Sequence, residues 1–458
     1  MKKLVKILKN KEIMGRIVFT IMILFIFRLG AQVLVPGVKI DSESDLSKYL
    51  SENNPLALMN LLGGGTLQSF SIFALGVSPY ITAQIIVQLL STDVLPALSE
   101  LKRQGQYGRK KIEMATRYLT LMLGAVQAYG ILKTMQSGEQ QLIHFTLGDN
   151  WLTYVYVVVI LLAGTMVVMW LGDQISVKGI GNGISMIIFA GIVCSLPNQM
   201  VNAWNQWCNP YVTTSIGEGA TISGIFKFLL YVFAYLLIIA FVTFIELSKR
   251  KIPVQHSGKG GGQTQSMAKA SFLPIKINSA GVIPVIFASS ILMAPSVIMA
   301  FIDNDAGTKA KWLGIFSTST MYNNGGWYMP WGLIIYLVLT IAFCFFYANL
   351  QINPQQLAEN FQKNGSYIPG IRPGNETERY VRKVLNRVTV IGAAALALIA
   401  ALPPVLTMTG VFGSNQSLAL GGTGLIIVVG VALEINSQID GLLAGKSFEE
   451  VVAAGGQG

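Results

Sequence analysis

The stretch GGGTLQSFSIFALGVSPYITAQIIVQLL, from Gly63 to Leu90, joins a glycine-rich, half-polar segment directly to an apolar helix. Ala74 to Leu90 makes a helix of about 26 Å, which barely crosses the hydrocarbon layer of a membrane. The segment 60–73 is too polar and too rich in glycine to face lipid. Such a segment is tolerated at membrane depth only inside protein or in a water-lined cavity. We therefore expect a short re-entrant element that fills a central cavity.

The alternative for this segment is an ordinary outer loop. It does not explain the apolar run FSIFAL at 70–75, which a solvated loop would not need. Three consecutive glycines, Gly63, Gly64 and Gly65, each lower helix stability by about 1 kcal/mol relative to alanine. The element is therefore predicted to be weakly held and displaceable.

Composition places the rest of the chain in a membrane. Of its 458 residues 52% are apolar and only 12% are charged, against about 25% charged in soluble domains. The sequence predicts an all-α polytopic membrane protein with ten transmembrane helices, at 17–35, 74–91, 116–136, 152–172, 183–201, 224–246, 278–301, 331–350, 388–407 and 420–438. The first run is longer than the apolar region of a secretory signal, so we expect it to be retained.

Basic residues concentrate in every second connecting segment, which places both termini in the cytoplasm. Anionic lipid near these segments accounts for most of the net charge of +11 without a nucleic-acid-binding domain. Two inner loops, 247–277 and 351–387, are longer than a helix connection requires. Loops so basic should meet an acidic cytosolic partner, for which ribosomal RNA and an acidic motor protein are both candidates.

Enzyme chemistry finds little support in the sequence. Cys194, Cys208 and Cys344 have no CxxC spacing, and the two histidines fall on opposite sides of the predicted membrane. Neither KGIGNG (178–183) nor GKGGGQTQ (258–265) completes a phosphate-binding motif. We predict no catalytic residue, no metal site and no cofactor.

Transport of some kind remains. Coupled carriers place charged residues inside their spans, whereas here only Arg28, Glu246 and Glu434 lie near span ends. A passive conduit is favoured, and the alternative is a secondary transporter with a broken helix that binds a small substrate.

Five blocks of sequence resemble the SecY family of bacterial protein-conducting channels: SIFALGVSPYITAQIIVQLL (71–90), GIGNGISMIIFAGIV (179–193), LPIKINSAGVIPVIFASSI (273–291), PGIRPG (369–374) and LGGTGLIIVVGVALE (420–434). The resemblance covers nearly the whole chain. It implies two pseudo-symmetric halves, 1–202 with spans 1–5 and 203–458 with spans 6–10. It further implies the central channel subunit of the Sec translocase, which passes unfolded secretory proteins across the membrane and releases transmembrane segments sideways into lipid.

The resemblance also implies roles for particular residues. Segment 60–73 becomes a re-entrant plug helix, with Leu61, Leu62, Gly63, Gly64, Gly65, Thr66, Leu67 and Phe70. A constricting pore ring falls at Ile81, Ile85, Ile188, Ile192, Ile286 and Ile427. The spacing i, i+4 of the pairs 81/85 and 188/192 presents one helix face each. From spacing alone these isoleucines would be assigned to the lipid-facing surface.

A lateral gate is expected between the second and seventh spans, where Gln84, Gln127 and Asn278 would bond across the closed seam or serve ordinary helix packing. Docking of a motor or ribosome falls to Lys249, Arg250, Lys251 and Arg372. The fourth-loop tip (256–271) is rich in glycine and glutamine where the family commonly has arginines, so contact there could move to Lys259 and Lys269. Implied partners are small single-span translocase subunits, the motor ATPase SecA, the ribosome, and preproteins with their signal sequences. The implied location is the bacterial cytoplasmic membrane.

Overall fold

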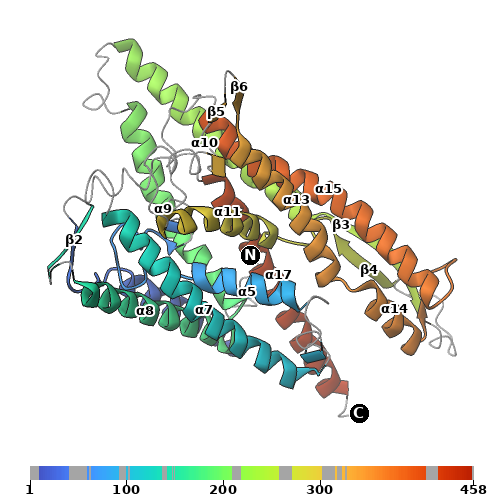
Figure 1. Ribbon diagram of the computed structural model, residues 1–458. Coiled ribbons are helices and arrows are strands. Elements are labelled where there is room, and N and C mark those ends of the chain that lie inside the picture. Colours follow the sequence, from blue (N-terminus) through green and yellow to red (C-terminus); the bar gives the residue numbers. More distant parts are fainter. Residues whose placement is uncertain are drawn as a thin grey trace.

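The computed structural model describes residues 10–40, 59–60, 63–91, 100–101, 104–136, 142–146, 148, 150–208, 218–256, 271–301, 315–316, 322–324, 327–408 and 421–455. Within these residues the fold is a helical bundle with small antiparallel sheets at its ends (Figure 1). The long helices are α2 (Lys11–Gly30), α5 (Ser78–Leu90), α7 (Gln106–Gln136), α8 (Trp151–Lys178), α9 (Gly183–Cys208), α10 (Glu218–Leu247), α11 (Ile283–Phe301), α13 (Trp331–Gln351), α15 (Asn375–Met408) and α17 (Gly421–Gly455).

Each of the ten predicted spans overlaps one of these helices. In the described part of the chain, seven helices are long and apolar enough to cross a membrane, and Ser78–Leu90 and Ile283–Leu292 are shorter apolar helices. Helix α7 is in neither group, because Gln127 and Lys133 interrupt its apolar half. Several helices continue beyond the predicted spans, α15 by a polar, charged segment that begins at Asn375.

Local sequence explains where several helices begin. Asn10 caps α2 by accepting a hydrogen bond from the Glu12 backbone N–H. Pro79 lies in the first turn of α5, where its missing N–H costs nothing. Asn353 caps the short helix α14 (Pro354–Lys363) by accepting from the N–H groups of Gln355 and Gln356.

The strands are short and lie in three sheets. Strand β1 (Val38–Ile40) pairs with β2 (Ile143–Phe145), with Val38 opposite Phe145. Strand β5 (Tyr322–Asn324) pairs with β6 (Trp327–Met329). The third sheet has the order β4-β3-β7, from β3 (Lys249–His256), β4 (Ser271–Lys276) and β7 (Ser366–Tyr367). It joins the two long loops of the sequence into one unit at the end of α13 and α15 (Figure 1).

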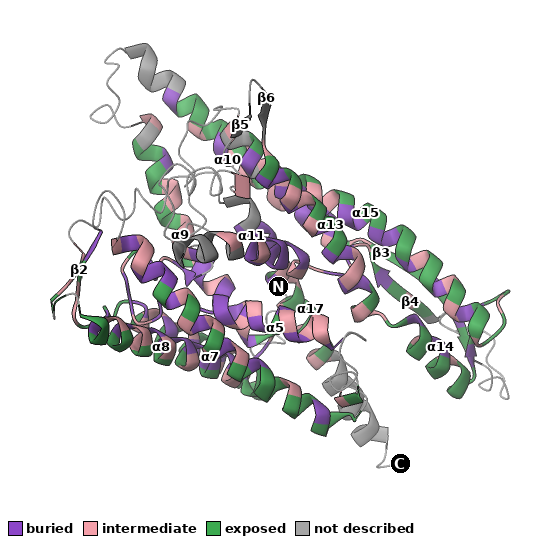
Figure 2. Cartoon of the chain, in the orientation of Figure 1, coloured by how far each residue is buried: buried purple, intermediate pink, exposed green. Residues whose placement is uncertain are grey.

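The main core runs through the middle of the bundle, where buried side chains concentrate on α5 and α11 (Figure 2). Helix α5 packs against α7, α11 against α13, and α13 against α15. Large apolar side chains such as Phe25, Phe233 and Val338 are exposed on the outside, as expected for helices that face lipid. The expected boundary between the two halves, 202/203, falls inside α9 rather than between helices.

Candidate functional site

The six predicted ring isoleucines lie together in the centre of the bundle. Helix α5 supplies Ile81 and Ile85, and α9 supplies Ile188 and Ile192. Ile286 of α11 and Ile427 of α17 complete the set. All six belong to one cluster of buried side chains, with exposed fractions of 1% to 9%. They do not face lipid, so the assignment to the lipid-facing surface that spacing alone would give is wrong.

The segment before α5 packs against this cluster from one side. Gly63, Gly64, Thr66, Leu67 and Phe70 are buried, while Leu61 and Leu62 lie outside the described residues. The segment is only briefly helical: residues 59, 60 and 63 are helical, and turns follow from 64 to 70. This differs from the expected plug helix, because Gly64 and Gly65 adopt φ of +73° and +84°, which a right-handed helix cannot continue through.

Gly64 lies directly against the backbone of α9. A Cβ atom placed on Gly64 would lie 2.5 Å from the Gly191 Cα atom, so the two backbones touch. Gly191 belongs to α9 and directly precedes Ile192. The absence of side chains on Gly64 and Gly191 therefore allows the segment to pack directly on α9, the helix that carries Ile188 and Ile192.

Helix α2 and the chain after it fasten the segment on its other side. The Arg28 Nη1 atom donates to the Gly64 carbonyl at 2.8 Å. The Ile72 N–H donates to the Val33 carbonyl at 2.9 Å. The rings of Phe27 and Phe73 stack with their centroids 5.9 Å apart. Leu67, Phe70 and Leu75 enter a second apolar cluster with residues of α7 and α8. The sequence analysis noted Arg28 only as a charge near a span end and did not connect it to this segment.

The predicted seam is present as helix packing, since α11 contacts both α5 and α7. Its three polar residues do not meet. Gln84 is exposed, and the Gln127 Oε1 atom is buried without a hydrogen-bond partner among the described residues. The Asn278 amide donates to Glu246 of α10 at 2.5 Å and to the Gly281 carbonyl at 3.0 Å. The expected bond across the seam is therefore absent within the described residues, and Asn278 instead donates a hydrogen bond to the half-buried carboxylate of Glu246.

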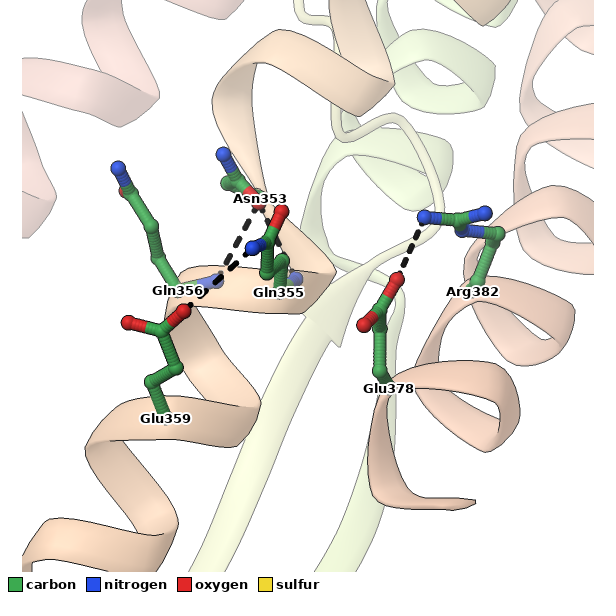
Figure 3. A network of polar contacts seen from close by, with 6 residues as sticks. All are labelled: Asn353, Gln355, Gln356, Glu359, Glu378 and Arg382. Atoms are coloured by element: carbon green, nitrogen blue, oxygen red, sulfur yellow. Dashed lines mark hydrogen bonds and ion pairs between the residues drawn. The ribbon is translucent and has the colours of Figure 1, made fainter. Parts of the chain in front are cut away.

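The described parts of the two long loops form one folded unit, which we call the basic platform: β3, β4, β7, α14 and residues 368–388, from the turn before α15 into that helix. It has its own apolar core, which includes Ile252, Ile275, Val381 and Leu385 together with Ala348 at the end of α13. Figure 3 shows two of its polar contacts, the Asn353 cap of α14 and the Arg382–Glu378 ion pair of 2.6 Å on α15. Within the described residues the two loops are thus folded.

The predicted docking residues all lie on this platform and are exposed. Lys249, Arg250 and Lys251 begin β3, and Arg372 lies in the turn before α15. The turn is shaped by Gly370 and Gly374, with φ of +81° and +104°. The Arg372 carbonyl accepts from the Thr377 hydroxyl at 2.9 Å, which fixes the backbone and leaves the side chain in solvent. The fourth-loop tip with Lys259 and Lys269 lies outside the described residues.

The glycine-rich turn between α8 and α9 does not hold a phosphate. Its Ile180 and Gly181 N–H groups donate to the Thr20 hydroxyl and the Gln438 side chain, at 3.1 and 2.8 Å. Within the described ranges no group of histidine, cysteine and acidic residues could hold a metal ion. Cys344 is buried and Cys194 is exposed.

These features together describe a helical protein with several apolar helices long enough to cross a membrane and a buried cluster of isoleucines in the middle of the bundle. The sequence profile of the SecY family matches residues 71–436. The protein translocase subunit SecY of Lactococcus lactis subsp. lactis (strain IL1403) is 41% identical over 449 residues, covering 98% of this chain and 97% of that protein. The chain belongs to the SecY family. It is a family of translocase subunits, which confirms that the chain is not an enzyme.

Solved structures share the fold. One is a SecY structure, which is described as showing that the plug domain stabilises the closed state of the translocation channel and maintains a membrane seal. It matches with a TM-score of 0.63 and 17% identity, covering 94% of this chain and 92% of that one. Sec61 in the canine ribosome–channel complex from the endoplasmic reticulum matches with a TM-score of 0.57 and 17% identity, covering 94% and 93% of the two chains. At such identities the likeness concerns the fold alone.

Proposed function

We propose that the chain is the central channel subunit of a Sec translocase. Unfolded secretory proteins pass through its centre, and apolar segments leave sideways into lipid. The observation that carries this proposal is the gathering of six isoleucines from four helices into one buried cluster. Family membership supports it, since the relatives are translocase subunits.

The isoleucine cluster acts as a pore ring in this proposal. β-branched side chains are stiff at χ1, so the ring keeps its shape and closes around a passing chain while excluding water and ions. Residues 60–73 act as the plug that occupies the channel at rest. The burial of this segment and its seat on Gly191 support that role, as does the description of the plug in the related structure.

Lateral release takes place between α5 and α11, with α7 and α13 beside them. The contacts of α11 with α5, α7 and α13 support this placement. Opening between α5 and α11 separates the two proposed halves, residues 1–202 with spans 1–5 and residues 203–458 with spans 6–10. Gln84, Gln127 and Asn278 line this gate in the proposal, although they make no bond to one another in this conformation.

The basic platform receives the partner that drives transport, because the chain itself offers no nucleotide site among the residues described. Lys249, Arg250, Lys251 and Arg372 would contact an acidic surface such as ribosomal RNA or the motor ATPase SecA. The canine relative in a ribosome complex supports the ribosome as one such partner. Small single-span subunits would clamp the bundle in the cytoplasmic membrane, with both termini in the cytoplasm and anionic lipid near the basic segments.

Reconstituted vesicles test the channel against the alternative of a secondary transporter. Vesicles that contain the full complex should import a secretory preprotein when the motor ATPase and ATP are supplied, and should not exchange small solutes. Deletion of residues 60–70 should leave import intact and raise the resting ion leak. Solute exchange without preprotein import would overturn the channel, and an unchanged leak in the deletion variant would overturn the plug.

A further inference from the structure

Arg28 has no carboxylate partner among the described residues and lies near the end of an apolar helix. Charged groups in such positions are costly, and they usually pair or serve function. Among the described residues Arg28 forms no ion pair, and its one hydrogen bond from Nη1 goes to the Gly64 carbonyl, 36 residues later in the chain. A hydrogen bond from a charged donor is roughly twice as strong as a neutral one. Arg28 thus holds the proposed plug at the residue that touches α9.

Two hydroxyl groups in the same segment work in the opposite direction. Thr66 and Ser71 are 1% and 0% exposed, and neither side-chain oxygen has a hydrogen-bond partner within the described part of the chain. An unsatisfied buried hydroxyl carries a desolvation cost that water removes. Displacement of the part around Gly64 would hydrate Thr66, and Ser71 would be hydrated only when its bridge to Leu34 also opens. The seated position therefore contains a penalty that is relieved when the segment leaves.

The far end of the segment is anchored independently of Arg28. Ile72 bonds to Val33 through the backbone, and Leu34 and Ser71 form an isolated β-bridge. Phe73 stacks on Phe27. Loss of the Arg28 bond would thus free the part around Gly64 without detaching the chain from α2.

We infer that Arg28 is a positioning residue that sets how firmly the plug is seated, and that the unsatisfied hydroxyls of Thr66 and Ser71 set how readily it leaves. The inference rests on the proposed function of 60–73 as a plug. The Arg28 bond and the apolar burial of Leu67 and Phe70 favour the seated state, and the two buried hydroxyls oppose it. The balance between them sets the resting leak and the ease with which a cargo opens the channel.

The test is the resting ion leak of the reconstituted complex. Arg28→Met should raise it roughly tenfold or more, because a hydrogen bond from a charged donor is lost. Arg28→Lys should restore most of the seal, since it retains a charged donor. Arg16→Met is the matched control on the same helix, because the Arg16 side chain is 40% exposed and its ion pair among the described residues is with Glu12 of its own helix. Thr66→Val and Ser71→Ala should lower the leak and slow the start of preprotein import.

Combining Arg28→Met with the deletion of residues 60–70 distinguishes a failure of this inference from a failure of the plug assignment. If the plug assignment is wrong, the deletion alone leaves the leak unchanged. If the plug assignment holds but the inference is wrong, the deletion raises the leak while Arg28→Met does not, or Arg28→Met raises the leak further in the deletion background. If both hold, Arg28→Met raises the leak only when the plug is present. A rise in leak in Thr66→Val or Ser71→Ala would overturn the part played by the hydroxyls.

Discussion

Replacing Gly64 with alanine adds one methyl group at the point where the buried segment touches α9. The left-handed conformation of Gly64, at φ +73°, costs a non-glycine residue about 1–2 kcal/mol. The new Cβ atom would also lie 2.5 Å from the Gly191 Cα atom. Backbone cannot move aside as a flexible side chain does, so this overlap adds about 1–3 kcal/mol. The seated position should therefore lose about 2–5 kcal/mol, which favours displacement by a factor of about thirty or more.

Gly65 provides the matched control. Its φ of +84° imposes the same conformational cost on alanine, but a Cβ atom there would meet nothing within 4 Å. Gly191→Ala provides the reverse case, because Gly191 has an ordinary helical φ and its Cβ atom would approach Gly64 to 3.0 Å. The resting conductance of the three variants, reconstituted at equal density in planar bilayers, should be highest for Gly64→Ala. Equal conductance in Gly64→Ala and Gly65→Ala would refute the reasoning that the Gly64–Gly191 contact seats the segment.

Three further predictions concern the ring and the basic platform. Ile85→Ala should raise ion leak during preprotein import by opening the ring, whereas Ile21→Ala, on a side chain that is 60% exposed, should leave it unchanged in the same fluorescence assay of vesicles. Leu385→Ala removes a fully buried side chain from the platform core and should destabilise the platform by about 2–5 kcal/mol. Limited proteolysis within 249–387 should become faster, and an unchanged rate would contradict the assigned core. Arg250→Glu with Lys251→Glu should weaken ribosome or motor binding in co-sedimentation, with a smaller dependence on salt, and leave thermal unfolding unchanged because both residues are exposed. Binding that is unaffected at low salt would remove these residues from the docking surface.

The sequence predicted the helices well because length and apolarity are properties of short windows. Each predicted span overlaps a helix, and the i, i+4 pairs on α5 and α9 do share one face that points to the core. The polar, glycine-rich character of 60–73 also sufficed to predict its burial. That Ile286 and Ile427 would join the same cluster came from family resemblance, since nothing local distinguishes them from lipid-facing isoleucines.

Contacts between distant segments could not be predicted in this way. The approach of Gly64 to Gly191 depends on how α9 is placed, and no local pattern reports that placement. The expectations for Asn278 were a bond across the seam or ordinary helix packing, and it bonds to the half-buried carboxylate of Glu246 at the end of α10. The pairing of Gln255 with Tyr367 likewise joins strands more than a hundred residues apart.

The basic platform has a mechanical consequence. Its core includes Ala348 of α13 and Val381 and Leu385 of α15, so it cannot tilt without taking both helices with it. Helix α15 runs unbroken for 34 residues, about 51 Å, from the platform through the bundle. α13 in turn packs on α11, which borders α5. A force applied to the platform would therefore be transmitted through α15 and α13 to the contact between α5 and α11.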